Sequence, residues 1–539
     1  MRPGARRTAI VAGLLLAALA AGCGGGGTAS PARPGERANE ARIYLANYPP
    51  SLCLIGKTDS STEEVAIQIS DSLVQYDPQL ELEPRVARNW SFSPDRRTLT
   101  FTLRDGVRWH DGLPVTADDV VFTIERLRDP VMENRVWAPS FVDLESVVAP
   151  DDHTVVARYS VATPDVLEGW RVPLLPRHLA ADDEDLMTGS FARSPVGCGP
   201  FRFVSADSGR RIELEANDDY WDGRPHLDRL IFKVFEEQRT GYQALLTGDL
   251  DVMPVTSNLL AAYRESGTHE GLDSFTFTRL NVTYIAWNQD GSNPFFDDAG
   301  VRRALLLALD RPAFSEAVVD GLATPAVTTY PLSGIWADPE LAPLPHDPQA
   351  ARRLLDEAGW VDGDGDGVRE RDGRPFRFTL LINESRQALV DRMAAWAQQS
   401  WASIGVDCRI EKLEFQAARE RRFSHRFEAA LGTFTLTPNP DQSELYASSA
   451  RDDGYNFFGL ADAEVDRLLQ AGRTTFDPSR RREIYRALQR RLAELQPVAA
   501  LFDFDTPVLL DARLRGVTPS PLGFLRTTQG PRTWSWPDE

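Results

Sequence analysis

The chain has 539 residues, of which 42% are hydrophobic and 26% charged, a composition typical of a soluble globular protein with more than one domain. Its formal net charge of −20 at pH 7 argues against a nucleic-acid partner, because neutralising a phosphate backbone requires a basic surface. Beyond the N-terminal segment, no apolar run is long enough to cross a membrane.

The N-terminal segment has the pattern of an export signal. The basic start MRPGARR is followed by a short apolar run, TAIVAGLLLAALAAG, and by small residues that lead to Cys23. These residues resemble a bacterial lipobox, so we predict a lipoprotein signal peptide over 1–22 and lipidation at Cys23. Residues 23–40 are rich in Gly, Pro and Ala and indicate a flexible tether.

These features predict an exported protein at the outer face of the cytoplasmic membrane, which it contacts through the lipid anchor only. An ordinary signal peptide followed by an incidental cysteine is the alternative interpretation.

Short strand-like and helical segments alternate along the body, which favours α/β or α+β architecture. The predicted strands are TLTFTLRDG, HTVVARYS, RIELEAN, LIFKVF, FTFTRL, YIAWN, FRFTLLI and DCRIEKLEF. Thr116 is placed to cap a helix over 117–127, and Pro348 to open one that stops at Gly359. Two further helices are expected around Pro312, and a helical pair over 461–475 and 477–497.

His110 and Asp111 stand side by side in RDGVRWHDG, where a catalytic pair and a structural turn are both conceivable. Asp-Gly dipeptides at 105–106 and 111–112 are turn signals on either side of a short segment. We therefore predict a turn that leads into the capped helix, with Trp109 packed inward. Motifs for phosphate loops, zinc proteases and serine hydrolases are missing from the sequence, which predicts no catalytic residues and no enzyme.

An acidic segment, DGDGDGVRERDG, resembles the first half of a calcium-binding loop. Asp362, Asp364 and Asp366 occupy its first, third and fifth positions, and Glu370 its ninth, but the twelfth is Gly373. A polar hairpin is the simpler interpretation, and we keep structural calcium as the alternative; the sequence indicates no other cofactor.

The number of cysteines does not decide which of them form a disulfide. Without Cys23 the chain has Cys53, Cys198 and Cys408, and an odd number permits one disulfide with one thiol left over. The spacing alone does not select a pair.

Several segments, in order, resemble the bacterial extracellular solute-binding proteins of family 5, the oligopeptide-, dipeptide- and nickel-binding components of ABC importers. The segments are ELEPRVARNWSFSPDRRTLTFTLRDGVRWHDGLPVTADDVVFTIERLRDP, SPVGCGPFRF, LEANDDYWDGRPHLDRLIFKVF, YIAWNQDGSNPFFDDAGVRRALLLALDRPAF, HDPQAARRLLDEAGW and DDGYNFFGLADAEVDRLLQAGRTTF. They are spread over nearly the whole mature chain.

The resemblance implies an α/β, two-lobed, periplasmic-binding-protein-like fold of class II type, with an inserted subdomain and a hinge between the lobes. The implied parts are lobe I over 41–75, 190–286 and 500–539, the inserted subdomain over 76–189, and lobe II over 287–499. Such a protein is not an enzyme. It captures a peptide, a modified peptide or another small solute between its lobes and delivers it, as a monomer, to an ABC permease and ATPase complex.

Departures from the family pattern qualify these expectations. Cys53 and Cys198 both replace family residues in lobe I, from which we predict that they form a disulfide. Peptide-binding members hold the peptide amino group with an Asp, and Leu436 or Thr437 stands at that position here. Because a buried ammonium needs a paired carboxylate, this departure argues against an ordinary peptide with a free amino group, and a modified peptide, a glycoside or another small solute are the alternatives.

The resemblance also implies which residues line the cleft. On lobe I these are Ser51 and Cys53, and on lobe II they are Asn288, Trp336, Phe434, Thr435 and Thr437. A solute sensor or chaperone-like lipoprotein of the same fold, without a dedicated transporter, is the alternative function.

Overall fold

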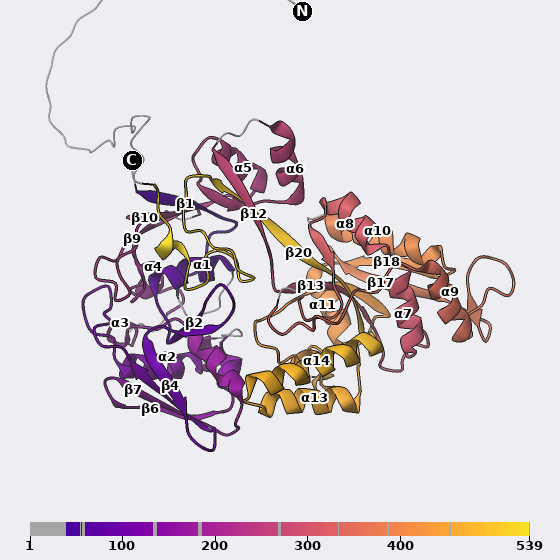
Figure 1. The fold of residues 1–539 in the computed structure, drawn as a ribbon, viewed down its shortest axis with the longest axis horizontal. Coiled ribbons are helices and arrows are strands. Elements are labelled where there is room, and N and C mark those ends of the chain that lie inside the picture. Colours follow the sequence, from indigo (N-terminus) through magenta and orange to yellow (C-terminus); the bar gives the residue numbers. More distant parts are fainter. Residues whose placement is uncertain are drawn as a thin grey trace, which may run out of the picture. The chain divides into compact units, whose positions relative to one another are not determined.

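One long strand, β20 (Val498–Asp511), runs through both halves of the main sheet in the computed structural model (Figure 1). The structure describes residues 39–537 except 54, 56–59, 133–136, 182–185, 208, 268–270, 332–333, 385–387 and 453. The predicted signal peptide, Cys23 and most of the tether lie outside the described residues. The body from Asn39 onward forms one compact unit.

The first half of the main sheet belongs to lobe I. Its strand order is β8–β9–β10–β1–β11–β20, and β12 pairs with β20 as well. The strands are β1 (Glu40–Leu45), β8 (Phe201–Asp207), β9 (Arg211–Ala216), β10 (Arg229–Val234), β11 (Val252–Pro254) and β12 (Leu272–Thr278). The helices are α1 (Ser60–Ile69), α4 (Ser190–Arg193), α5 (Gln238–Leu246) and α6 (Ser257–Ser266).

The inserted subdomain has a separate four-stranded sheet of order β4–β5–β7–β6 and a small β2–β3 ladder. Its strands are β2 (Val74–Tyr76), β3 (Leu82–Pro84), β4 (Ala87–Phe92), β5 (Thr98–Leu103), β6 (Leu144–Asp151) and β7 (Thr154–Tyr159). Its helices include α2 (Ala117–Leu127), α3 (Arg177–Ala180) and the 3₁₀ helix η3 (Pro164–Arg171). As predicted, Thr116 starts α2, and its capping box pairs it with Asp119.

The second half of the main sheet belongs to lobe II and has the order β18–β17–β19–β13–β20, with β14 on β20. Its strands are β13 (Asn281–Trp287), β14 (Ala323–Pro325), β17 (Arg377–Asn383), β18 (Asp407–Leu413) and β19 (Ala429–Thr435), beside the β15 (Glu370–Arg371) and β16 (Arg374–Pro375) hairpin. Its helices are α7 (Ala299–Leu307), α8 (Arg311–Val319), α9 (Pro348–Glu357), α10 (Ala388–Ala402), α11 (Phe415–Phe423), α12 (Ser443–Tyr446), α13 (Ala463–Thr474) and α14 (Pro478–Leu495).

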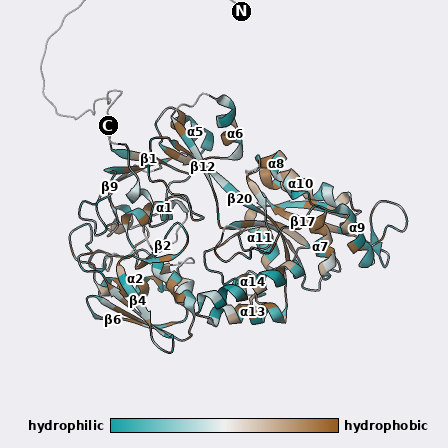
Figure 2. Ribbon diagram, in the orientation of Figure 1, coloured by the Kyte–Doolittle hydropathy of each residue, from teal (hydrophilic) through white to brown (hydrophobic). Residues whose placement is uncertain are grey.

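Burial follows the expected periodicities. Strand β17 is coloured largely hydrophobic in Figure 2, whereas α13 and α14 mix hydrophilic and hydrophobic residues along their length. Along α14 the buried positions include Ile484, Leu488 and Leu492, one turn apart. The predicted strands and helices all occur, and Asp347 caps α9 by accepting from the backbone N–H of Ala350 at 2.8 Å.

Strand pairing locates the hinge between the lobes. Residues 498–502 of β20 pair with β13 in lobe II, whereas residues 505–511 pair with β12 in lobe I. The chain therefore crosses once between β12 and β13 and once in the middle of β20. This pairing favours placing all of β13 in lobe II, although the predicted boundary assigned residues up to 286 to lobe I; the domain boundaries themselves stay a prediction.

Candidate functional site

The strand ends that face the hinge come from both lobes. In lobe I, β11 begins opposite Leu510 of β20 and ends opposite Val508, so it runs toward the hinge. Strand β1 is parallel to β11 and therefore also ends toward the hinge. In lobe II, Thr435 at the end of β19 pairs with Asn281 at the hinge end of β13. The carboxyl ends of β1 and β19 therefore point to the same region from opposite sides. Ligands of open α/β sheets bind outside such carboxyl ends.

Strand β19 presents a row of hydroxyl groups as it reaches the hinge. Thr433, Thr435 and Thr437 alternate with two residues of lower exposure, so the three threonines lie exposed on one face. The Oγ1 of Thr433 also lies 3.2 Å from that of the buried Thr283 on β13. Thr435 and Thr437, both predicted to line the cleft, thus lie on an exposed face. Thr433 was missed, although the Thr-Phe-Thr-Leu-Thr alternation signals it.

Phe434 lies on the opposite face of β19, so its predicted role in lining the cleft is wrong. The side chain is 7% exposed, and its ring stacks on Tyr284 with centroids 3.9 Å apart. The side-chain period of two along a strand places this residue in the core whenever its neighbours Thr433 and Thr435 face outward.

The prediction of Asn288 as a cleft residue is also wrong. Asn288 follows the far end of β13, away from the hinge, and is fully buried. Its Nδ2 donates to the backbone oxygens of His425 and Phe427 at 3.1 and 2.9 Å. The side chain therefore satisfies two backbone acceptors of a connecting loop and has no surface for a ligand.

On lobe I, Ser51 and Cys53 lie in the segment after β1, but their side chains are buried. The Ser51 hydroxyl donates to the Met187 backbone oxygen at 2.7 Å and accepts from the Cys53 backbone N–H at 3.0 Å. Cys53 is 1% exposed. The segment follows the hinge-facing end of β1, whereas these two side chains fix the loop rather than form its surface.

The predicted disulfide between Cys53 and Cys198 is not formed in the structure, and no disulfide joins the described cysteines. Cys198 points toward the loop after α1, where its Sγ lies 3.9 Å from the Oγ of Ser70. Burial raises the pKa of the Cys198 thiol to about 12, so it stays protonated and unreactive at neutral pH.

Trp336, the remaining predicted cleft residue, is partly buried on lobe II. Its ring meets the Tyr485 ring edge-on at 5.8 Å, and the Arg481 guanidinium lies 5.4 Å from the ring centroid. This places Trp336 beside α14, on the side where lobe II contacts the inserted subdomain through Arg481.

Asp441 is the nearest acidic candidate after β19, and its carboxylate is already engaged. Its Oδ1 accepts from the backbone N–H and the hydroxyl of Ser443, and its Oδ2 lies 3.3 Å from Arg473. Leu436, the other candidate for the amine-anchoring position, packs against three hydrophobic clusters. The hinge-facing end of β19 is therefore neutral at Thr435 and Thr437.

A surface pocket of about 620 Å³ lies farther along lobe II, between α12 and α13. Its lining includes Glu444, Tyr455, Asp466 and Arg473 and none of the predicted cleft residues. The salt bridge from Arg473 to Asp441 connects this pocket to the segment that follows β19.

His110 occupies a structural position in the inserted subdomain. Its Nδ1 accepts from the backbone N–H of Gly197 at 3.2 Å, and its Nε2 lies 3.1 Å from the Gly199 oxygen, as for a neutral ring protonated at Nε2. Gly106 and Gly112 have positive φ, and Gly112 donates to the Trp109 oxygen, which confirms the predicted turns. Trp109 is 2% exposed, so it packs inward as predicted.

Burial lowers the pKa of His110 to about 4, which makes the fold sensitive to acid. In the unfolded chain His110 binds a proton near pH 6.5, but in the folded chain only near pH 4. Its contribution to stability is therefore complete above pH 6.5 and is lost as the pH falls to 4, by about 3 kcal/mol. Urea titrations should show a smaller loss between pH 7 and 4.5 in His110→Gln than in the wild type; an equal loss would contradict this assignment.

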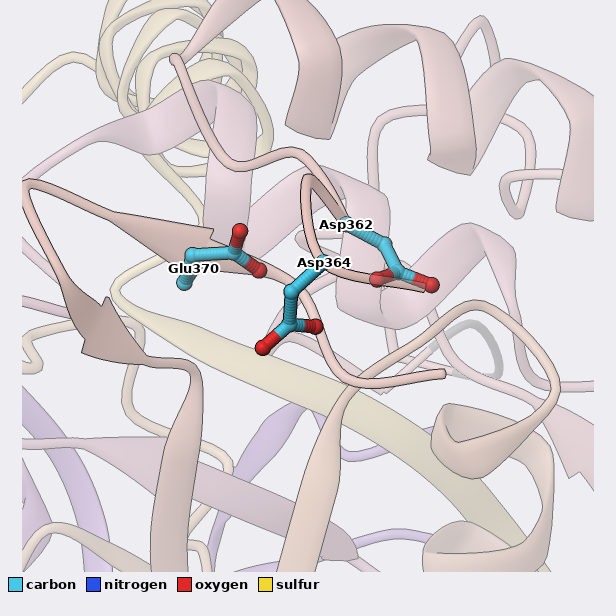
Figure 3. A group of neighbouring side chains, drawn as sticks. All are labelled: Asp362, Asp364 and Glu370. Atoms are coloured by element: carbon cyan, nitrogen blue, oxygen red, sulfur yellow. The ribbon is translucent and has the colours of Figure 1, made fainter. Parts of the chain in front are cut away.

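The acidic loop gathers three carboxylates that could hold a cation: Asp362, Asp364 and Glu370, whose oxygens lie within 4.8 Å of one another (Figure 3). The Asp362 Oδ2 also accepts from the backbone N–H of Gly367 at 3.1 Å. Asp366 is not in this group, and its Oδ1 accepts from the Val368 N–H. The same hydrogen bonds fit the polar hairpin formed by β15 and β16, so structural calcium stays a prediction.

Calcium addition separates the two interpretations of the loop. If three carboxylates hold Ca²⁺, calcium concentrations well above Kd should raise Tm, because a ligand that binds only the folded state stabilises it. Asp364→Asn should abolish the increase, whereas Asp372→Asn, outside the group of three, should retain it. An unchanged Tm in the wild type would contradict calcium binding and leave the polar hairpin as the remaining interpretation.

Comparison with known proteins identifies the family. Residues 81–456 match the model of the bacterial extracellular solute-binding proteins, family 5, and the chain belongs to this family. Among the residues that the structure describes, no helix combines the length and apolar character needed to span a membrane.

The similar proteins include binding proteins for different solutes. The chain is 29% identical to the oligopeptide-binding protein AppA of Bacillus subtilis over 85% of each chain. It is 32% identical to a putative ABC transporter peptide-binding protein of Brucella ovis over 62% of each. The crystal structure of NikZ from Campylobacter jejuni in complex with Ni(L-His) has 25% identity and a TM-score of 0.75, covering 93% of this chain and all of NikZ. The fold is therefore that of a two-lobed solute-binding protein.

Proposed function

We propose that this protein captures a small solute between its two lobes and delivers it to an ABC importer, without catalysing a reaction. The observation that carries the proposal is the convergence of the carboxyl ends of β1 and β19 at the hinge, in a chain of this family. The similarity to AppA of Bacillus subtilis, an oligopeptide-binding protein, and to a putative ABC transporter peptide-binding protein of Brucella ovis supports the transport role. We expect the protein to act as a monomer.

The chemistry at the end of β19 narrows the class of solute. Thr435 and Thr437 offer hydroxyl groups that donate and accept hydrogen bonds but cannot balance a buried positive charge. Asp441, the acid that follows, is paired with Arg473. We therefore propose a solute that presents hydroxyl or amide groups to β19, such as a glycoside or a peptide whose amino group is modified.

Mass spectrometry of small molecules released from the freshly purified mature protein tests this class directly. The expected result is one family of neutral or modified solutes in a stoichiometric amount. Peptides with unmodified amino groups would contradict the argument from Thr437. Supplying such peptides to the Thr437→Asp variant is the matched test, because the new carboxylate should strengthen their binding by about tenfold or more.

We also propose that Cys23 carries a lipid that holds the protein at the outer face of the cytoplasmic membrane. The pattern before Cys23 in the sequence supports this proposal. Cys23→Ser should move the protein from the membrane pellet to the soluble exported fraction, because the lipid on this residue is proposed to hold the protein at the membrane. Cys408→Ser is the control and should stay in the pellet. A Cys23→Ser variant that still sediments with membranes would contradict lipidation.

A solute sensor or chaperone-like lipoprotein of the same fold is the alternative function. It shares the cleft and the lipid anchor, so binding measurements do not separate the two. Neighbouring genes for a permease and an ATPase would favour the importer, and solute uptake that is unchanged after deletion of this gene would favour the sensor.

A further inference from the structure

The inserted subdomain and lobe II meet at a contact away from the hinge. Arg481 on α14 forms an ion pair with Asp165 at the start of η3, and the two side chains are only 9% and 16% exposed. Phe476, which precedes Arg481 at the start of α14, meets the Phe92 ring of β4 edge-on at 5.7 Å, and the Arg96 guanidinium lies 5.1 Å from the same Phe476 ring. The contact thus combines a buried ion pair with an aromatic pair.

The two sides of this contact belong to parts that the hinge separates. The inserted subdomain is fastened to lobe I: Arg85 pairs with Asp71, the Leu174 N–H donates to the Asp71 oxygen, and His110 bonds to the backbone of Gly197 and Gly199. Helix α14 leads directly into the lobe II half of β20. A rotation about the hinge therefore changes the separation of Asp165 and Arg481.

Both partners also make contacts within their own part of the molecule. The Thr163 hydroxyl accepts from the backbone N–H of Asp165 at 3.3 Å and so starts η3. The Arg481 Nε donates to the Gly472 oxygen at 3.0 Å, and the guanidinium lies 5.4 Å from the ring centroids of both Trp336 and Tyr485. Such contacts reduce the entropy that each side chain loses when the pair forms.

We propose that the Asp165–Arg481 pair, supported by Phe92 and Phe476, is a latch that stabilises the closed arrangement of the lobes. In the open arrangement both charges are hydrated and separate, and in the closed one they satisfy each other. Removal of one partner leaves the other charge buried without compensation, so closure becomes unfavourable. Because a solute binds tightly only to the closed arrangement, the latch also sets the apparent affinity.

Distance measurements between spin labels test the latch without any solute, so the result does not depend on the proposed ligand class. Labels at Val131→Cys in the inserted subdomain and Val361→Cys in lobe II occupy positions that are 83% and 47% exposed. In the wild-type background the short-distance population should dominate. Asp165→Asn should reduce the ratio of short to long distances by about tenfold or more.

Two further variants separate the ion pair from general damage. Glu483→Gln, which breaks the exposed Arg480 pair on the same helix, should leave the distances unchanged. The charge exchange Asp165→Arg with Arg481→Asp should restore much of the short population. If Asp165→Asn proves too unstable to measure, Phe476→Ala removes the aromatic half and should also lengthen the distances. Unchanged distances in Asp165→Asn would overturn the latch, and so would unchanged distances in Phe476→Ala if that variant has to replace it. A charge-exchanged pair that does not recover the short distances would also overturn it.

Discussion

Asp71→Asn should lower the free energy of unfolding by about 3–5 kcal/mol, one of the two largest effects that we expect in this chain. The Asp71 carboxylate lies 3.4 Å from the Arg85 guanidinium and accepts from the Tyr220 hydroxyl at 2.7 Å and from the Trp221 indole at 2.9 Å. Burial alone would lower the pKa of Arg85, but Asp71, Tyr220 and Asp222 together raise it. Loss of the carboxylate leaves the buried guanidinium poorly compensated.

Urea unfolding monitored by circular dichroism measures this effect. Asp228→Asn is the matched control, because its carboxylate pairs with Arg224 on the surface and should contribute less than about 1 kcal/mol. The same network joins the inserted subdomain to lobe I, so Asp71→Asn should also loosen that junction. Equal stabilities of the two variants would show that the buried network contributes no more than a surface pair.

Arg311→Met should cost about 3 kcal/mol for a different reason, the loss of donors rather than of charge. Arg311 is 1% exposed, and its guanidinium donates to the backbone oxygens of Ala326, Ala500 and Leu344 at 2.7 to 2.9 Å. Burial lowers the pKa of Arg311 to about 10, so the group still carries its proton at neutral pH. Methionine fills most of the space but leaves three carbonyl groups without their donor.

The exposed Arg303 on α7 supplies the control for this experiment. Arg303→Met should change the free energy of unfolding by less than about 0.5 kcal/mol. The Arg311 contacts include β20 close to the hinge, so thermal unfolding of lobe II should shift to lower temperature. A stability of Arg311→Met equal to that of the wild type would mean that water satisfies the three carbonyls.

Local signals in the sequence predict the elements well. Thr116 before α2 and Asp347 before α9 are capping residues that act within four residues of the chain, and both caps form. The alternation of Thr433, Phe434 and Thr435 determines which side chains of β19 face outward, because successive residues of a strand point to opposite faces. The error at Phe434 came from treating neighbouring residues of a strand as one surface.

Long-range geometry explains the remaining errors. Asn288 is buried because two carbonyls from residues 425 and 427, distant in the sequence, require its amide. The Cys198 thiol lies near Ser70 at the end of α1 and forms no disulfide, which the spacing of cysteines along the chain does not reveal. The pair of Asp165 and Arg481 joins residues 316 positions apart, so a reading of local patterns could not have found it.

Solute binding by two single variants tests the central claim, that the solute is held between the lobes against the end of β19. The solute released from the purified protein is titrated calorimetrically into wild type, Thr435→Arg and Thr474→Arg. Thr435 lies at the hinge end of β19, whereas Thr474 lies exposed on α13. We predict that Thr435→Arg weakens binding by about 100-fold or more, because it places a long charged side chain where the solute sits, and that Thr474→Arg binds as the wild type does. Wild-type affinity in Thr435→Arg would contradict this location of the site.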